Sequence, residues 1–386
     1  MNTKSESLDE LFRHYKVDWY RCPIDRATLR DVMRKNDLQG LFQAVGHLVL
    51  AACAAALTLY FFLQGQWIGV LIALFAYGTL ASNFLYGCHE LGHASVFRTR
   101  WLNAVFLRVY SVLCWWNFHE YAMSHTYHHL YTLHPRADKE VTLPAEPSLK
   151  PLYLLQLFTI NVTGGFATRG LDVTILGIIK TAFGGYSVFS TPGWLEALYA
   201  DRPEARRRAV NWARLVLTIH VAVAVVSIVY GLWIIPIIFS LGPNIANWLA
   251  YFVGAPMHCG LRDDVPDFRK CVRSITLDPF SEFLYWRMNW HLEHHMFAGV
   301  PCYNLKKLHR AVADDMPEVR SFLGSWREMR ETWHRQKTEP GYQFDTPLPD
   351  TAGRAATVGE SEEVELLRSS VGGIAPPELR QASSGE

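Results

Sequence analysis

Three short histidine clusters contain the residues of this chain whose types and spacing could do chemistry. They read HELGH, HTYHH and HLEHH, and they hold eight of the sixteen histidines. On a helix, positions i, i+3 and i+4 lie on one face, so the side chains of each cluster can converge. Neutral imidazole is a ligand for iron, zinc, copper and nickel. The eight residues are His89, His93, His125, His128, His129, His291, His294 and His295.

The number of imidazoles predicts a site for two metal ions, because one zinc ion takes only about three or four protein ligands. HExxH alone is also the signature of zinc proteases, in which the glutamate is the general base. A membrane metalloprotease needs one further ligand, whereas this chain has two further clusters. A metal-binding or metal-transport protein would be expected to place its polar ligands inside membrane spans, and here the clusters lie outside them.

The apolar segments that must position these clusters predict an all-α integral membrane protein. Only 19% of the residues are charged, below the roughly 25% of an average soluble protein. Uncharged runs reach the length of about 20 residues that a helix needs to cross a bilayer. We expect four transmembrane helices in two hairpins, with a cytosolic helical cap that holds the histidines. The predicted spans are about 41–63, 67–86, 215–230 and 233–253.

The order of spans and clusters predicts that all three clusters share one face of the membrane. Two spans precede the first cluster, and two more separate the second from the third. Basic residues near the span ends gather on the cluster side, so the positive-inside rule makes that side, with both termini, cytoplasmic. Pro236 and Pro243 are expected to kink the fourth span. His47, inside the first span, is expected to be a packed residue and not a ligand.

The ends of the chain differ from this domain of residues 41–338. Residues 1–40 are expected to form a cytosolic segment with an amphipathic helix from Asp25 to Asn36, lying on the membrane surface or packed on the protein. Residues 339–386 are rich in proline, glycine, serine and acids, which predicts a disordered tail. The net charge of +1 gives no global attraction for nucleic acid. The seven cysteines form no CxxC pair, so no disulfide framework is expected.

In this order and with these spans, the clusters resemble those of the membrane fatty acid desaturase family. The similarity extends over roughly residues 20–335, and NWHLEHH followed by Val300-Pro301 resembles the third histidine box of that family. The resemblance implies a non-haem di-iron centre held mostly by histidine, O2 as co-substrate and a fatty acyl substrate. Hydroxylases and ketolases that act on lipids or carotenoids share the three boxes and remain the alternative.

The resemblance also implies further site residues. Relatives use a histidine between the fourth span and the third box, where this chain has His258. The asparagine that relatives place one turn earlier is replaced by Gly254, and Asn247 is a candidate substitute. Carboxylates often orient metal-bound imidazoles, and the candidates here are Glu90, Glu120, Asp138 and Glu293. His119 and His134 flank the second cluster and are expected to lie outside the ligand set.

Electrons for such a reaction must come from outside this chain. It has no dinucleotide fingerprint, no thiolate cluster and no haem-binding motif of a fused cytochrome b5. We therefore expect a separate carrier of the ferredoxin or cytochrome b5 type, with its reductase, and a membrane lipid or acyl substrate. The aromatic pairs Trp115-Trp116 and Tyr285-Trp286 are expected either to line the acyl chain or to anchor the protein at the membrane interface.

Overall fold

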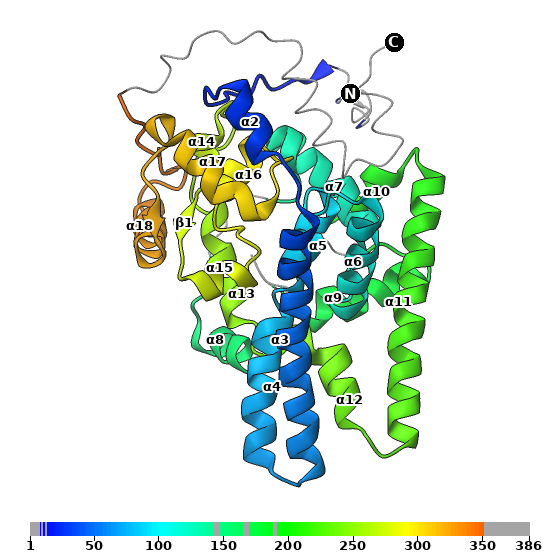
Figure 1. Ribbon diagram of the computed structural model, residues 1–386. Helices are drawn as coiled ribbons and strands as arrows, with labels where there is room; N and C mark the ends of the chain where they lie inside the picture. Colours follow the sequence, from blue (N-terminus) through cyan, green and yellow to red (C-terminus); the bar gives the residue numbers. More distant parts are fainter. Residues whose placement is uncertain are drawn as a thin grey trace.

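The computed structural model describes residues 8, 11, 14–141, 147–164, 170–187 and 191–350. This part of the chain is mostly helical, as predicted. Its strands are β1 (Ile275–Thr276) and β2 (Arg320–Ser321), which pair in parallel with Ile275 opposite Arg320. Figure 1 shows long helices extending toward one end and a group of shorter helices at the other.

Three helices among the described residues are long and apolar enough to cross a membrane: Asp37–Leu63, Trp67–Gly92 and Pro203–Val229. They correspond to α3 (Asp37–Leu63), to α4 (Trp67–Ala81) with the following α5 (Phe84–Gly92), and to α11 (Pro203–Val229). α3 and α4 form an antiparallel hairpin that turns at Gly65, where φ is +68°. The first three predicted spans therefore match helices of spanning length.

The fourth predicted span, 233–253, is not one continuous helix. The segment consists of α12 (Ile234–Pro236), the π-helix η1 (Ile237–Leu241), the 3-10 helix η2 (Gly242–Asn244) and α13 (Trp248–Gly254). Proline lacks the amide that a helix interior requires, and its ring clashes with the preceding turn. Pro236 lies in the first turn, where proline is tolerated, of a helical segment that continues to Asn244. The helix is interrupted only after Pro243, at residues 245–247, so the span is broken there and not merely kinked.

Protein groups satisfy the backbone of this broken segment. The Asn161 amide donates to the Asn244 carbonyl at 2.7 Å, and the Ala246 amide donates to the Thr159 carbonyl at 2.8 Å. On the other side α4 is very close, since a Cβ on Gly78 would lie 2.3 Å from the Ile245 carbonyl oxygen. Irregular backbone at membrane depth is tolerated where it is buried in protein in this way.

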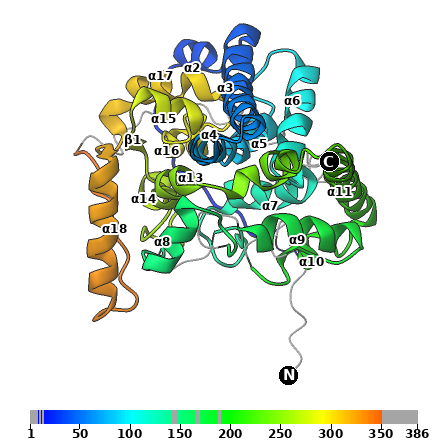
Figure 2. The same ribbon diagram turned by 90° about the horizontal axis from the view of Figure 1, so that it is seen from below.

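The shorter helices form the cap around the ends of the long ones (Figures 1 and 2). Two groups of helices contribute, one between α5 and α11 and one after α13. The first group is α6 (Arg100–Leu113), α7 (Phe118–Tyr131), α8 (Pro151–Phe158), α9 (Leu171–Ala182) and α10 (Trp194–Tyr199). The second is η3 (Ala255–Met257), α14 (Phe268–Cys271), α15 (Pro279–Leu284), α16 (His291–Met296), η4 (Cys302–Asn304), α17 (Leu305–Ala311), η5 (Ala313–Asp315) and α18 (Phe322–Gln336).

The N-terminal amphipathic helix is α2 (Arg26–Val32), which is shorter than predicted. The Asp25 side chain caps it by accepting from the amides of Ala27 and Thr28. It ends early because Asn36 serves as the N-cap of α3. Leu29 and Val32 are buried in the main core, so the apolar stripe of α2 packs on the protein.

The predicted tail boundary at residue 339 is too early. The Phe344 amide donates to the Gly260 carbonyl at 2.8 Å, and Thr346 is buried. Lys270 donates to the Thr346 carbonyl at 2.8 Å. Residues 339–350 therefore pack on the cap despite their composition, because backbone hydrogen bonds compensate for the scarcity of apolar side chains. Residues 351–386 of the predicted tail lie outside the described residues.

A core of aromatic side chains joins the α3–α4 hairpin to the cap. His47 is fully buried there: its Nε2 lies 3.0 Å from the Leu80 carbonyl, and the Trp286 indole donates to its Nδ1 at 3.0 Å. Tyr285 and Trp286 are completely buried, and Trp115 stacks on His220. His47 is thus a packed residue, as predicted, and the two aromatic pairs are core side chains and not interface anchors.

Candidate metal centre

Three short helices and one loop bring the predicted site residues together. The first cluster is on α5 with its C-cap, the second is on α7 and the third is on α16, whereas His258 follows the 3-10 helix η3. All nine imidazoles are buried, none with more than 5% of its surface exposed. Within each cluster, the i, i+3 or i, i+4 spacing puts the histidines on one face of their helix, and the other faces of these helices pack against the core.

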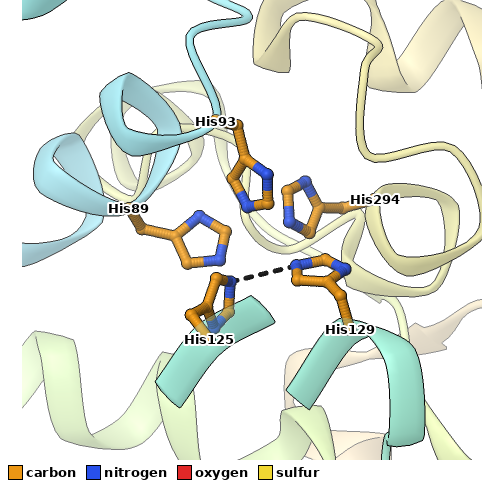
Figure 3. A group of neighbouring side chains, drawn as sticks. All are labelled: His89, His93, His125, His129 and His294. Carbon is orange, nitrogen blue, oxygen red and sulfur yellow. Dashed lines mark hydrogen bonds between the residues drawn. The ribbon is translucent and has the colours of Figure 1, made fainter. Parts of the chain in front are cut away.

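The nine imidazoles form two groups, in each of which the potential ligand atoms lie within 4.8 Å of one another. Figure 3 shows the rings of the first group pointing toward a common centre from α5, α7 and α16. The first group is His89, His93, His125, His129 and His294. The second group is His128, His258, His291 and His295. Because α7 and α16 contribute to both groups, the two centres must be neighbours.

The nitrogen atoms inside the two groups fit metal ions better than they fit one another. His125 Nε2 lies 3.0 Å from His129 Nε2, and His291 Nε2 lies 3.0 Å from His258 Nε2. Both nitrogens of His93 are buried without a hydrogen-bond partner, as are those of His294 and Nε2 of His89. Unpaired buried polar atoms are costly and rare. A cation at the centre of each group would satisfy the convergent lone pairs.

The outward-facing Nδ1 atoms of five of these histidines have acceptors or hydroxyl partners. Such contacts fix the tautomer and leave Nε2 free to bind a metal, as is usual for metal-bound histidine. The pairs are His89 with the Glu90 carboxylate at 3.0 Å, His125 with Glu140 at 2.8 Å, His128 with Asp138 at 2.8 Å, His258 with the Cys271 carbonyl at 3.1 Å and His295 with the Thr132 hydroxyl at 3.0 Å.

Of the four carboxylates expected to orient imidazoles, two contact a histidine of the groups, and their orienting role stays a prediction. Glu90 and Asp138 contact the histidines just described. Glu120 instead accepts hydrogen bonds from Thr181, Ser187 and Arg206. Its position on α7 turns it away from the histidine face, so it ties α7 to α9 and α11.

Glu293 lies between two box histidines in the sequence but faces the opposite side of α16. It accepts from the Ser274 hydroxyl at 2.5 Å and lies 2.5 Å from His309 Nδ1. These partners connect α16 to β1 and α17. The expectation that Glu293 orients a ligand is therefore wrong, because a residue at i+2 projects away from the face shared by i, i+3 and i+4.

Sequence reasoning missed Glu140. Its Oε1 pairs with His125 and its Oε2 accepts from the Ser124 hydroxyl at 2.6 Å. In the sequence, the signal for Glu140 was its position two residues after the candidate Asp138. In the structure, Oδ1 of Asp138 accepts from the Glu140 amide, while Oδ2 contacts His128. His134 Nδ1 donates to the Thr132 carbonyl at 3.0 Å, and His134 belongs to neither group.

His119 also lies outside both groups. It is half-buried and packs beside Phe118. Asn247 precedes α13, and its Oδ1 is buried without a hydrogen-bond partner. The role expected for Asn247 stays a prediction.

Burial and the carboxylates set the protonation of the histidines. Burial lowers the pKa of His258 to about 3, and it lowers the pKa of His294 to about 3 as well. Both imidazoles are therefore neutral near pH 7, with a lone pair available for a metal. Burial also lowers the pKa of His128, but the Asp138 carboxylate outweighs that effect and the net pKa is raised. Asp138 thus makes His128 more basic than His258 and His294.

Replacing Asp138 with asparagine should weaken metal binding at the second group. The variant loses the charged acceptor of His128, and an outer carboxylate of this kind typically contributes about 10–100-fold in metal affinity or activity. Metal content per chain after dialysis against a chelator measures the effect. Glu331→Gln, at an exposed position on α18, is the control and should retain wild-type metal. Equal metal retention in both variants would contradict the orienting role of Asp138.

Comparison with known proteins identifies a family and a relative. The family model described as fatty acid desaturase matches residues 65–327, which include every residue of both histidine groups. The chain is also similar to an sn-1 oleoyl-lipid 12-desaturase of Picosynechococcus sp. (strain ATCC 27264 / PCC 7002 / PR-6). The two are 23% identical over 317 residues, which cover 76% of this chain and 85% of the relative.

Proposed function

Because the chain belongs to the fatty acid desaturase family, we propose that it introduces a double bond into a fatty acyl chain in an O2-dependent reaction. The observation that carries the proposal is the pair of buried histidine groups at the cap end of the spanning helices. The acyl chain loses two hydrogens as two C–H bonds break and a C=C bond forms. O2 takes up those two hydrogens with two electrons from the carrier and two protons, and leaves as two waters.

The two groups would hold two iron ions, one in each. When bound, the ions would supply the activation of O2 that removing hydrogen from an unactivated methylene requires. The donor set supports this assignment, since it contains only imidazoles, which suit iron, and no thiolate. The carboxylates of Glu90, Asp138 and Glu140 hold the Nδ1 atoms of their histidines and so keep the rings oriented.

We further propose that the cap and both termini face the cytoplasm. Basic residues near the ends of the long helices, such as Arg98, Arg100 and Arg206, are on the cap side, as the positive-inside rule requires. The broken segment from α12 to α13 would complete the second hairpin as a fourth, irregular crossing. A separate ferredoxin or cytochrome b5 type carrier, with its reductase, would reach the site from the cytoplasm.

The substrate is proposed to be an acyl chain in the membrane. The name of the similar relative describes a lipid-linked oleoyl chain as what that protein acts on. For this chain the support is physical: the site lies where the apolar helices enter the cap, so a lipid tail can approach without crossing bulk water. Lipid-linked chains are accordingly the first substrates to test, and carrier-linked chains the second.

Expression in a host that supplies a reductase and a carrier tests the proposal directly. Lipids from cells with the wild-type chain should contain a product two hydrogens lighter than in cells with an empty vector. A product with one added oxygen would instead indicate a lipid or carotenoid hydroxylase. Metal analysis of the purified protein should find two irons per chain. A single zinc with no lipid change would favour a metalloprotease.

A further inference from the structure

His258 is held differently from the other eight histidines of the two groups. They lie on α5, α7 and α16 or at the end of α5, whereas His258 is the C-cap of η3, which continues α13 to Met257. From His258 to Gly260 the chain turns away from this helix, so tertiary contacts decide its position there. The groups that contact this loop therefore decide where the His258 imidazole lies.

One residue, Arg273, contacts the loop on both sides of His258. Its backbone amide donates to the Met257 carbonyl at 2.8 Å. Its guanidinium donates through Nη1 to the Cys259 carbonyl at 3.2 Å and also to the Pro256 carbonyl. Three hydrogen bonds from Arg273 thus reach carbonyls on both sides of His258, and the planar, rigid fork of arginine can donate to several acceptors at once.

The Arg273 guanidinium is in turn oriented by α18. Its Nε and Nη2 donate to Oε1 of Glu328 at 2.9 and 2.6 Å. Both side chains are almost fully buried, at 2% and 12% exposure. The other carboxylate oxygen, Oε2, accepts from Arg320 at 2.9 Å. Glu328 therefore keeps a second cationic partner if Arg273 is replaced, which limits the cost of leaving a buried charge unpaired.

We propose that Arg273 is a positioning residue for the second histidine group, acting with Glu328 to hold His258 toward His291. The proposal rests on the proposed function in that this group is taken to hold an iron ion. Without the guanidinium, the carbonyls of Pro256 and Cys259 lose their donor, and the loop can relax away from His291 Nε2, which now lies 3.0 Å from His258 Nε2. The first histidine group, on α5, α7 and α16, contains no residue of this loop.

The full-length protein, purified in detergent and loaded with ⁵⁷Fe, provides the test. Arg273→Gln should bind iron at the second group about 10–100-fold more weakly. After dialysis against a weak chelator it should therefore keep about half of the wild-type iron. The Mössbauer spectrum should lose the contribution of one iron while the other persists. A merely structural role for Arg273 would lower thermal stability and iron at both groups together.

Arg320→Gln is the matched control, because it removes the other cationic partner of Glu328. The other contacts of the Arg320 side chain are with the Glu318 carbonyl and the Phe344 ring, and not with the His258 loop. It should keep wild-type iron and spectrum. Arg273→Lys guards against a folding failure of the glutamine variant. Lysine keeps the positive charge of Arg273 but lacks the planar guanidinium, so this variant too should lose iron from the second group and keep it in the first.

The outcomes separate this inference from the proposed function. Wild-type protein that binds fewer than two irons would overturn the proposed function whatever the variants do. Wild-type protein with two irons, together with two irons and an unchanged spectrum in both Arg273→Gln and Arg273→Lys, would overturn only the positioning role. Equal loss of iron from both groups would overturn it as well.

Discussion

Replacing His291 with alanine should abolish desaturation. His291 Nε2 lies 3.0 Å from His258 Nε2 and 3.1 Å from His295 Nε2, so it is the central donor of the second group. Its removal leaves three imidazoles and a cavity in place of the fourth. Removing a group that only orients a metal-bound histidine typically lowers metal affinity or activity about 10–100-fold. We therefore expect the loss of a histidine that would bind the metal directly to reduce product formation at least about 100-fold. Lipid mass spectrometry and iron content per chain measure it.

His134→Ala is the control for this variant. His134 is also buried and lies close to the second cluster in sequence, but it belongs to neither group. It should keep the wild-type iron content and most of the activity, with only a modest loss of stability. If His291→Ala still made wild-type amounts of product, the histidine groups would not be the site of the reaction. Equal inactivation of both variants would point to general unfolding.

Introducing a methyl group at Gly87 should destabilise the protein and displace the first histidine group. A Cβ at this position would lie 2.7 Å from the Tyr110 ring and 2.9 Å from the Trp286 ring. Both rings are fully buried, and the Tyr110 hydroxyl is bound to the Ala44 carbonyl, so neither can move aside easily. Overpacking of this kind costs about 1–3 kcal/mol. Because His89 follows two residues later on α5, we also expect reduced iron binding.

Gly92→Ala, on the same helix, is the matched control. A Cβ there would have no atom within 4 Å, and alanine favours a helix over glycine. Thermal unfolding in detergent should show a lower midpoint for Gly87→Ala and an unchanged or slightly higher midpoint for Gly92→Ala. A Gly87→Ala protein as stable as wild type would show that α5 can shift away from α6 at little cost.

Local spacing explains why the histidine faces could be predicted. Within one helical turn the direction of a side chain depends only on its position in the sequence, so HELGH, HTYHH and HLEHH each present one face. Counting the uncharged runs placed these faces at one end of the molecule, and the structure brings them together there. Three of the four spans could be predicted in the same way, because length and lack of charge are sufficient for a regular apolar helix.

The fourth span shows where this reasoning stops. It is apolar and uncharged like the other three, but the helix that begins at Ile234 ends at Asn244, directly after Pro243, and the next helix begins only at Trp248. Whether such a segment is kinked or broken depends on which groups can satisfy its backbone. Here Thr159 and Asn161, more than eighty residues away in the chain, do so. The residues near the two prolines in the sequence do not indicate which distant groups will satisfy this backbone.

By itself, the sequence determined the donor types, the helical faces that carry them and the apolar lengths that place them at one end of the protein. Only the tertiary structure decided how the nine histidines divide into two groups, and that Glu90, Asp138 and Glu140, but not Glu120 or Glu293, contact them. The physical reason is that direction along one helix is a local property. The meeting of α5, α7, α16 and the His258 loop depends instead on contacts between segments far apart in the chain.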